Sequence, residues 1–267
     1  MRHILGFASV TVGGVLLLGP SGCSADPSPE PPASSSPAPA SSSPPPGPPP
    51  GPPPGPLAGA GTAPIVAAAR AFLDGLDGGQ RDEGLFDRGD KEQQQRWSNL
   101  PSPVFERAGL RLGDLDDPDE EAFLAMMRAT LSAEGYERVL GSVAADDVLA
   151  STNRGGPQFG RQHVRIAIIG ERSADEPWQW QFGGHHLGVN AVVEGDALTL
   201  TPSLIGAQPA AWEAGGATVR PLGDITDQAF ALVGSLDGAA RERAVLGGTA
   251  IDIVLGPGQD CRTLPPE

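Results

Sequence analysis

A proline-rich tract from Ala25 to Pro56 divides this sequence into a short leading segment and one domain-sized segment. The tract is almost entirely proline, serine, alanine and glycine, and it holds sixteen of the 29 prolines in the chain. A tract of this composition has little apolar surface to bury and is typical of a semi-extended polyproline linker, rising about 3.1 Å per residue. We therefore expect residues 23–57 to be a disordered linker that starts at a lipidated Cys23, and residues 58–267 to form one folded domain.

The leading segment predicts export. Arg2 is followed by an apolar run from Ile4 to Leu18 and then by small residues up to Cys23. This is the plan of a signal peptide, here residues 1–22, and the run is shorter than the roughly 20 apolar residues of a membrane span. The residues before Cys23 resemble a bacterial lipobox, although Pro20 stands where an aliphatic residue is usual. Lipidation of Cys23 would anchor the protein to the membrane at the outer face of the cell, and ordinary secretion is the alternative.

The domain is acidic. From Leu57 to Glu267 it holds 17 basic and 31 acidic residues. A surface with this charge balance repels phosphate groups, which argues against nucleic acid as a partner. Cys23 lies before the linker, so Cys261 has no partner and no disulfide framework is expected.

Hydrophobic periodicity predicts the α+β class. Apolar residues recur at helical spacing in four segments, and they alternate with polar residues between the third and the fourth. The strands are expected to form an antiparallel meander over about 163–204, with a hairpin turn at Glu194-Gly195-Asp196 and helices before and after it. The helices are expected to begin near Thr62, Asp117, Ser132 and Asp224, of which the first three are N-cap residues.

Three histidines are candidates for chemistry. His185 and His186 follow a pair of glycines, and neighbouring residues on a regular strand point to opposite faces, so the two can share an ion only at a bulge. If residues 171–176 connect the first two strands, antiparallel pairing places His163 opposite about Gly184. The pattern then predicts a site for a divalent metal or for acid–base chemistry at His163, His185 and His186. The alternative is one core histidine bonded to the backbone and one histidine in solvent.

A second group of residues predicts a small-molecule site. Arg96 is suited to clamp an anion, and Trp97 follows it in a loop-like stretch. Tryptophans bury about 150–250 Å² each, so core packing is the competing role for all three. The candidate ligand-binding residues are Arg96, Trp97, Trp178, Trp180 and Asn190.

Familiar enzyme motifs are absent. The sequence has no Gly-x-Ser-x-Gly elbow, no phosphate-binding loop ending in Gly-Lys, no His-Glu-x-x-His and no Cys-x-x-Cys. The residues therefore indicate candidate sites without indicating a reaction.

Several short motifs follow one another in a fixed order between about Ala67 and Leu246. They are Arg96-Trp97-Ser98-Asn99-Leu100-Pro101, Gly109-Leu110-Arg111-Leu112-Gly113-Asp114-Leu115, Leu131-Ser132-x-x-Gly135-Tyr136, Pro177-Trp178-Gln179-Trp180, Gly184-His185-His186-Leu187-x-x-Asn190 and Thr201-Pro202 to Gly206-Ala207-x-Pro209. Together they resemble a bacterial family of domains of unknown function, number 3500. The resemblance implies an exported or lipid-anchored protein and no established reaction.

Two departures from that family matter. Ile169-Gly170 stands where family members usually have Phe-Gly. Family members also continue well past the equivalent of Glu267, so we expect this chain to lack a C-terminal segment and to have an impaired site.

Three functions stay open at this point. The first is a surface-tethered domain that binds a metal or a small ligand through its histidine-rich sheet segment. The second is a metal-dependent hydrolase or oxidoreductase that uses the same histidines, with Arg96 as a substrate clamp. The third is a structural envelope protein without a site.

Overall fold

The computed structural model describes residues 61–152, 155–173 and 175–245. The expected signal peptide, the linker and both cysteines lie outside these ranges. The helices are α1 (Ala63–Gly75), α2 (Gly78–Gly84), α3 (Lys91–Gln95), α4 (Asp117–Thr130), α5 (Ala133–Ala150), α6 (Gly223–Ser235) and α7 (Gly238–Ala244), with 3₁₀ turns η1 (Leu112–Asp114) and η2 (Arg161–His163). The strands are β1 (Leu85–Phe86), β2 (Leu110–Arg111), β3 (Arg165–Ile169), β4 (Trp178–Gly184), β5 (Leu187–Glu194), β6 (Ala197–Thr199), β7 (Leu204–Ile205), β8 (Trp212–Ala214) and β9 (Ala217–Val219).

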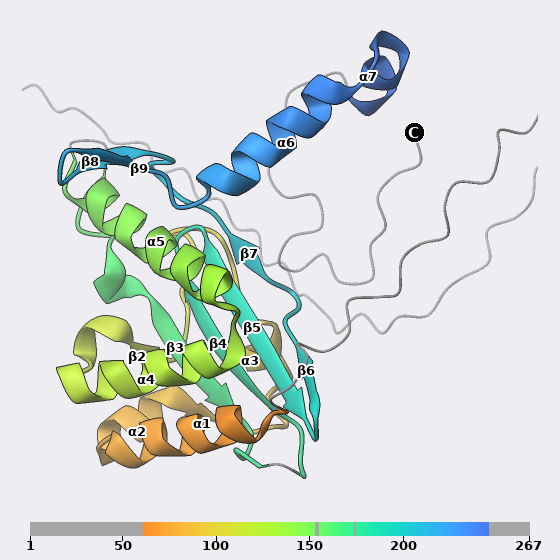
Figure 1. Ribbon diagram of the computed structural model, residues 1–267. Coiled ribbons are helices and arrows are strands. Elements are labelled where there is room, and N and C mark those ends of the chain that lie inside the picture. Colours follow the sequence, from red (N-terminus) through yellow and green to blue (C-terminus); the bar gives the residue numbers. More distant parts are fainter. Residues whose placement is uncertain (1–60, 153–154, 174, 246–267) are drawn as a thin grey trace, which may run out of the picture. The chain divides into compact units, whose positions relative to one another are not determined.

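A mostly antiparallel sheet lies at the centre of the described part (Figure 1). Strands β3, β4, β5 and β6 pair in chain order, so that Trp180 on β4 faces Ile168 on one side and Ala191 on the other. Strand β1 pairs parallel with β3, whereas β2 pairs antiparallel with β3 and β7 antiparallel with β5. The α+β class and the antiparallel meander are confirmed, and the short strands β1, β2 and β7 are additions that the periodicity did not reveal.

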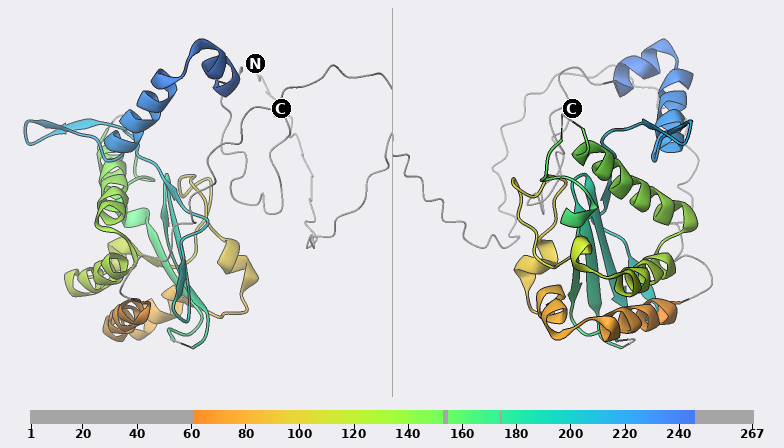
Figure 2. Two further views of the ribbon diagram at one scale, coloured as in Figure 1. Left: turned by 45° about the vertical axis from the view of Figure 1, so that its right-hand side comes forward. Right: turned by 90° about the vertical axis from the view of Figure 1, so that its left-hand side faces the viewer.

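Helices α1, α4 and α5 lie on one face of the sheet, and the segment around α3 lies on the other (Figure 2). Alternate residues of a strand point to the same face, so Trp178, Trp180 and Phe182 all point to the helix side. Phe123 of α4 meets them there, with its ring centroid 5.0 Å from that of Phe182 and 6.2 Å from that of Trp180. The structure thus places Trp178 and Trp180 in the core, fully buried, rather than on a ligand-binding surface.

The helix starts show where local signals hold. Ser132 caps α5 as expected, by accepting a hydrogen bond from a backbone N–H of the first turn. The expected cap of α4 is wrong by one residue, because Asp116 rather than Asp117 accepts that bond. Thr62 does not cap α1 either, since its hydroxyl donates to the carbonyl of Gly195 in the β5–β6 turn. A tertiary contact has replaced the local one.

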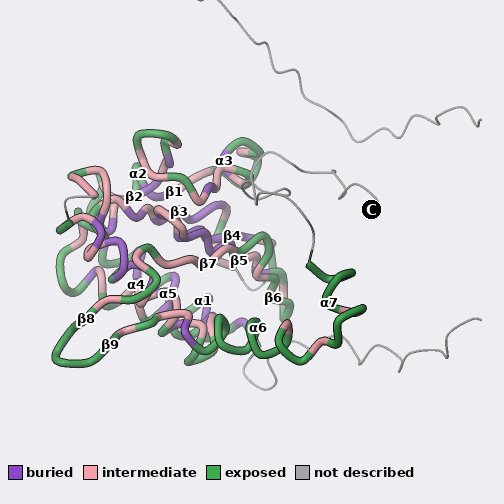
Figure 3. The backbone as a smooth tube through the Cα atoms, turned by 90° about the horizontal axis from the view of Figure 1, so that it is seen from above, coloured by how far each residue is buried: buried purple, intermediate pink, exposed green. Residues whose placement is uncertain are grey.

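Helix α6 is placed as expected but is poorly covered. Its apolar residues Ile225, Phe230 and Leu232 are exposed, Phe230 to 74 % (Figure 3). The apolar periodicity therefore predicted the helix correctly, but the apolar face of this helix is not buried. Across the described ranges, no helix combines the length and the apolar content that crossing a membrane requires.

Candidate functional site

The face of the sheet opposite the helices is polar. Gln179, Gln181 and Asn190 point to this face and are buried. The segment that begins with α3 covers them, and Gln93 donates from Nε2 to Oε1 of Gln181 at 2.9 Å. Both Gln179 and Gln181 donate to the carbonyl of Gln94. Buried amides are stable only when they are hydrogen-bonded, so these contacts fix the covering segment on the sheet.

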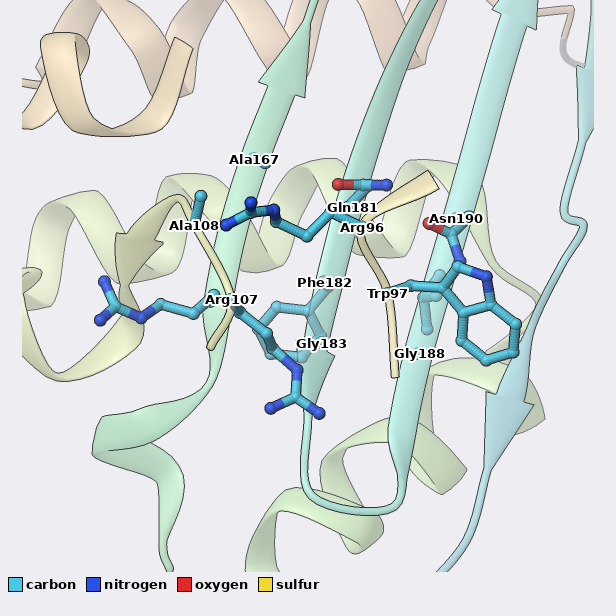
Figure 4. Close-up of a pocket in the computed structure, with 12 residues that line it drawn as sticks. Arg96, Trp97, Arg107, Ala108, Ala167, Gln181, Phe182, Gly183, Gly188 and Asn190 are labelled. Carbon is cyan, nitrogen blue, oxygen red and sulfur yellow. The ribbon is translucent and has the colours of Figure 1, made fainter. Parts of the chain in front are cut away.

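A small cavity lies between that segment and the sheet (Figure 4). Its volume is about 20 Å³, enough for one or two water-sized groups. Three of the residues predicted from the sequence to bind a ligand, Arg96, Trp97 and Asn190, border it. The lining residues are Arg96, Trp97, Arg107, Ala108, Arg165, Ala167, Gln181, Phe182, Gly183, Gly188, Val189 and Asn190.

Arg107 is the most constrained of these residues. Its side chain is buried, with 6 % of the residue surface exposed. Its Nη2 atom donates to the carbonyl oxygens of Ser98, Leu100 and Gly184, at 2.6, 2.6 and 2.7 Å. Its Nε and Nη1 atoms are also buried, and neither has a hydrogen-bond partner in the described part of the chain. The Nη2 group of Arg107 therefore connects the loop at Ser98 and Leu100 to the end of β4, while its Nε and Nη1 groups make no hydrogen bond within the described residues.

The charge of Arg107 is likewise unbalanced. Arg96 pairs with Glu92 and Arg165 pairs with Glu83, but within the described ranges no carboxylate forms an ion pair with Arg107. Desolvation by burial lowers the pKa of Arg107 from its ordinary value to about 10, and the nearby charge of Asp146 opposes this decrease. The group stays protonated at neutral pH, so the cavity borders a buried positive charge.

Asn190 supplies the complementary kind of atom. Its amide nitrogen donates to the carbonyl of Pro202 at 2.7 Å. Its amide oxygen is buried without a partner among the described residues, and it points toward Gln181 in Figure 4. An unpaired buried acceptor costs about 1–3 kcal/mol, so it is a position where a ligand donor would be stabilising.

Two glycines leave room for the side chains of Trp97 and Arg107. Gly183 and Gly188 face each other on β4 and β5. A Cβ atom on Gly188 would lie 3.0 Å from Cε3 of the Trp97 indole, and one on Gly183 would lie 3.5 Å from Nε of Arg107. Both side chains thus pack directly on the backbone of the sheet. A Cβ atom at Gly188 would force the indole of Trp97 to shift, whereas one at Gly183 would make an ordinary contact with Arg107.

The histidine pair forms the turn between β4 and β5, next to this cavity in the chain. Nδ1 of His185 lies 2.8 Å from Oδ1 of Asp146 on α5, and both side chains are at least nine-tenths buried. The second carboxylate oxygen of Asp146 accepts a hydrogen bond from the backbone N–H of Gly160. The ring of Phe159 packs against that of His185 at 4.8 Å. In the described residues no protein group bonds Nε2 of His185, which leaves this nitrogen for proton transfer or for a ligand.

His186 has a conformation that is rare for a residue with a side chain. Its φ angle is 55°, in the left-handed region. Its backbone N–H donates to the carbonyl of Asn99, its carbonyl accepts from Gly206, and its Nε2 lies 2.9 Å from Oε1 of Gln208. Two separate segments, one at Asn99 and one from Gly206 to Gln208, therefore hold the turn in place, which is the usual way that such strain is maintained.

His163 is not on the expected strand. The strand begins two residues later, at Arg165, and His163 ends the 3₁₀ turn η2 with its Nε2 atom 2.6 Å from the carbonyl of Pro157. His163 lies before the strand and is therefore not paired with Gly184, whereas the register of β3 and β4, with Arg165 opposite Gly183, is within one residue of the expected one. Among the described residues no group of three or more histidine, cysteine, aspartate or glutamate side chains is arranged to hold a metal ion, so the three histidines do not form a ligand set.

Two central residues were missed in the sequence. Asp146 lies in register with the buried stripe of α5, which includes Tyr136, Val139 and Val143, and a charged residue at such a position indicates a buried partner. Arg107 has no comparable signal, because its three carbonyl partners come from a loop and from the end of β4.

The family assignment rests on a sequence comparison. The family model described as "Protein of unknown function (DUF3500)" matches residues 58–267, the whole expected domain. No curated protein and no solved structure matches the chain. The chain therefore belongs to the DUF3500 family of proteins of unknown function.

Proposed function

We propose that this protein is an exported, lipid-anchored domain that binds a small organic anion in the cavity beside Arg107. The export signal and the linker support its location, with Cys23 as the anchor on the outer face of the membrane. The anion is supported by one observation above all, the buried guanidinium of Arg107 with two unused donors and no paired carboxylate in the described part. An anion there would use both donors in charge-assisted hydrogen bonds, which are about twice as strong as neutral ones.

The remaining lining residues fit the same ligand. Arg96 and Arg165 add positive charge around the cavity, although each already has a carboxylate partner. The indole of Trp97 provides a flat apolar wall. The small volume favours a ligand with one compact anionic group rather than a large polyanion.

The test is ligand-dependent stability of the purified chain. A ligand that binds only the folded state raises the free energy of unfolding by about 1.4 kcal/mol at ten times its Kd. We expect acetate to raise the urea midpoint saturably at constant ionic strength, and chloride not to do so. The variant Arg107→Lys keeps the charge but has no forked donor set, and should lose the effect, whereas the matched exposed variant Arg220→Lys should keep it. A wild-type protein whose stability does not respond to any small carboxylate or phosphate would contradict the proposal and leave Arg107 as a structural residue bonded to water.

A second candidate function is supported by the buried Asp146–His185 pair. A carboxylate that orients one ring nitrogen of a histidine leaves the other nitrogen ready to accept or donate a proton. In that case the protein is an enzyme in which His185 moves a proton, and His185→Gln should abolish turnover while carboxylate binding stays within about twofold. Loss of carboxylate binding in His185→Gln would instead assign the histidine to ligand binding.

A further inference from the structure

We infer that the ligand of the Arg107 cavity is a small hydroxycarboxylate, with its carboxylate on Arg107 and its hydroxyl on the amide oxygen of Asn190. This inference rests on the proposed function and specifies the ligand. Two residues that line the same cavity have buried polar atoms without a hydrogen-bond partner among the described residues. Arg107 has donors of this kind, and Asn190 has an acceptor. A simple carboxylate satisfies only the first, since it has no hydrogen to donate to Asn190.

The sheet register limits the length of the ligand. Nε of Arg107 lies beside Gly183, which faces Gly188, and Asn190 is two residues further along β5. With a rise of about 3.3 Å per residue and about 4.8 Å between strands, the Cα atom of Asn190 lies on the order of 8 Å from the Cα atom of Gly183, and this backbone spacing sets the scale of the cavity. Two hydrogen bonds of about 2.9 Å each leave space for only a few bonded atoms between the anionic group and its donor. A chain of two carbon atoms is the longest that meets this limit, in agreement with the cavity volume of about 20 Å³.

The surrounding charge decides between a hydroxyl and an ammonium group as the donor. Arg96, Arg107 and Arg165 all line the cavity, and Arg107 has no paired carboxylate in the described residues. An ammonium group among these guanidinium groups would be repelled, and a neutral hydroxyl would not. The geometry thus favours a hydroxy acid over an amino acid.

The experiment compares isosteric ligands on the wild-type protein. Glycolate should bind about two- to tenfold more tightly than acetate, as expected for one added neutral hydrogen bond. Methoxyacetate, which has the ether oxygen but no hydrogen to donate, should lose this advantage. The measurement is a calorimetric or fluorescence titration of the full mature chain at constant ionic strength.

Two variants assign the preference to Asn190. In Asn190→Leu the ratio of glycolate affinity to acetate affinity should fall to about one, the value expected without the added hydrogen bond. In Asn99→Leu, outside the cavity, this ratio should stay as in the wild-type protein. Equal affinities of glycolate and acetate for the wild-type protein would overturn the inference and leave the proposed anion site standing. Failure of every carboxylate to bind would overturn both. The comparison with methoxyacetate needs no variant, so it decides the inference even where Asn190→Leu does not fold.

Discussion

Asp146 and His185 are 39 residues apart in the chain, and their side chains meet at 2.8 Å at the end of the sheet. The contact connects the C-terminal part of α5 to the β4–β5 turn, and the same carboxylate also accepts a hydrogen bond from the backbone N–H of Gly160 at 2.7 Å. Arg107 holds this turn from the other side through the carbonyl of Gly184. The histidine turn and the cavity are thus parts of one connected structure.

Removal of the Asp146 carboxylate should therefore destabilise the fold. Asp146→Ala leaves a buried histidine and a backbone N–H without their partner, and breaking a buried pair in this way costs about 3 kcal/mol. The neighbouring variant Asp147→Ala removes only the acceptor of an exposed hydrogen bond to Arg161, and should cost less than about 1 kcal/mol. Urea denaturation of both variants measures the difference. Equal losses of stability would show that the Asp146–His185 contact is not important for folding.

Gly109 should not tolerate a side chain. Its φ angle is 108°, and a Cβ atom there would lie 2.4 Å from the carbonyl oxygen of Ile166 on β3. Gly109→Ala should lower the free energy of unfolding by at least about 2 kcal/mol, since both the backbone angle and the contact are unfavourable. Gly234→Ala in α6 meets open space and should raise stability by up to about 1 kcal/mol. A fully stable Gly109→Ala protein would mean that β2 does not pair with β3 as described.

Much of this fold could be predicted from local sequence signals. Helices α4, α5 and α6 begin within one residue of the expected positions, since capping residues and apolar spacing are encoded nearby. The alternation expected along β4 and β5 is confirmed, but the register puts Trp180 and Asn190, which were expected to share a ligand-binding site, on opposite faces of the sheet.

The site depended on contacts that local signals do not encode. Arg107 bonds a carbonyl 77 residues away, at Gly184, and nothing near Arg107 in the sequence indicates it. His163 was expected on a strand because periodicity does not locate the residue at which a strand begins. The apolar pattern that predicted α6 likewise does not say what covers Phe230, which is exposed.

Anion binding should depend on pH through Arg107. Burial lowers the pKa of Arg107 in the folded protein to about 10, below its ordinary value. Affinity for acetate should therefore be constant from about pH 7 to 9 and fall up to tenfold per pH unit above about pH 10, where the guanidinium loses its proton.

The same linkage acts on folding without ligand. Above about pH 10 the unfolded chain binds more protons at Arg107 than the folded chain does, because the pKa of Arg107 is lower in the folded chain. The contribution of this residue to the free energy of unfolding therefore rises with pH. Titrations of the protein with acetate at several pH values check the predicted pH dependence of the affinity. An affinity that is unchanged up to about pH 11 would separate anion binding from the charge of Arg107.

Membrane attachment should depend on Cys23. If this cysteine is lipidated, Cys23→Ala removes the lipid that anchors the chain. The apolar run Ile4–Leu18 does not replace this anchor, because it is too short to span a membrane and belongs to the signal peptide. Fractionation of cells should then find the variant in the medium and the wild-type chain in the membrane fraction. A Cys23→Ala protein that stays with the membranes would show that another part of the chain holds it there.

The central claim is that the unused donors of Arg107 bind an anion, and the Nε–H resonance of Arg107 reports this directly. In an NMR titration of the ¹⁵N-labelled chain with glycolate at constant ionic strength, the Nε–H signal of Arg107 should shift saturably, while that of Arg220, which is paired with Asp227 on the surface, stays in place. The signal of Arg107 should be assigned by its absence in Arg107→Lys. A saturable shift confined to Arg107 and its neighbours in the cavity is the predicted result. An Arg107 signal that does not move at any glycolate concentration, or that moves only together with Arg220, would contradict the account.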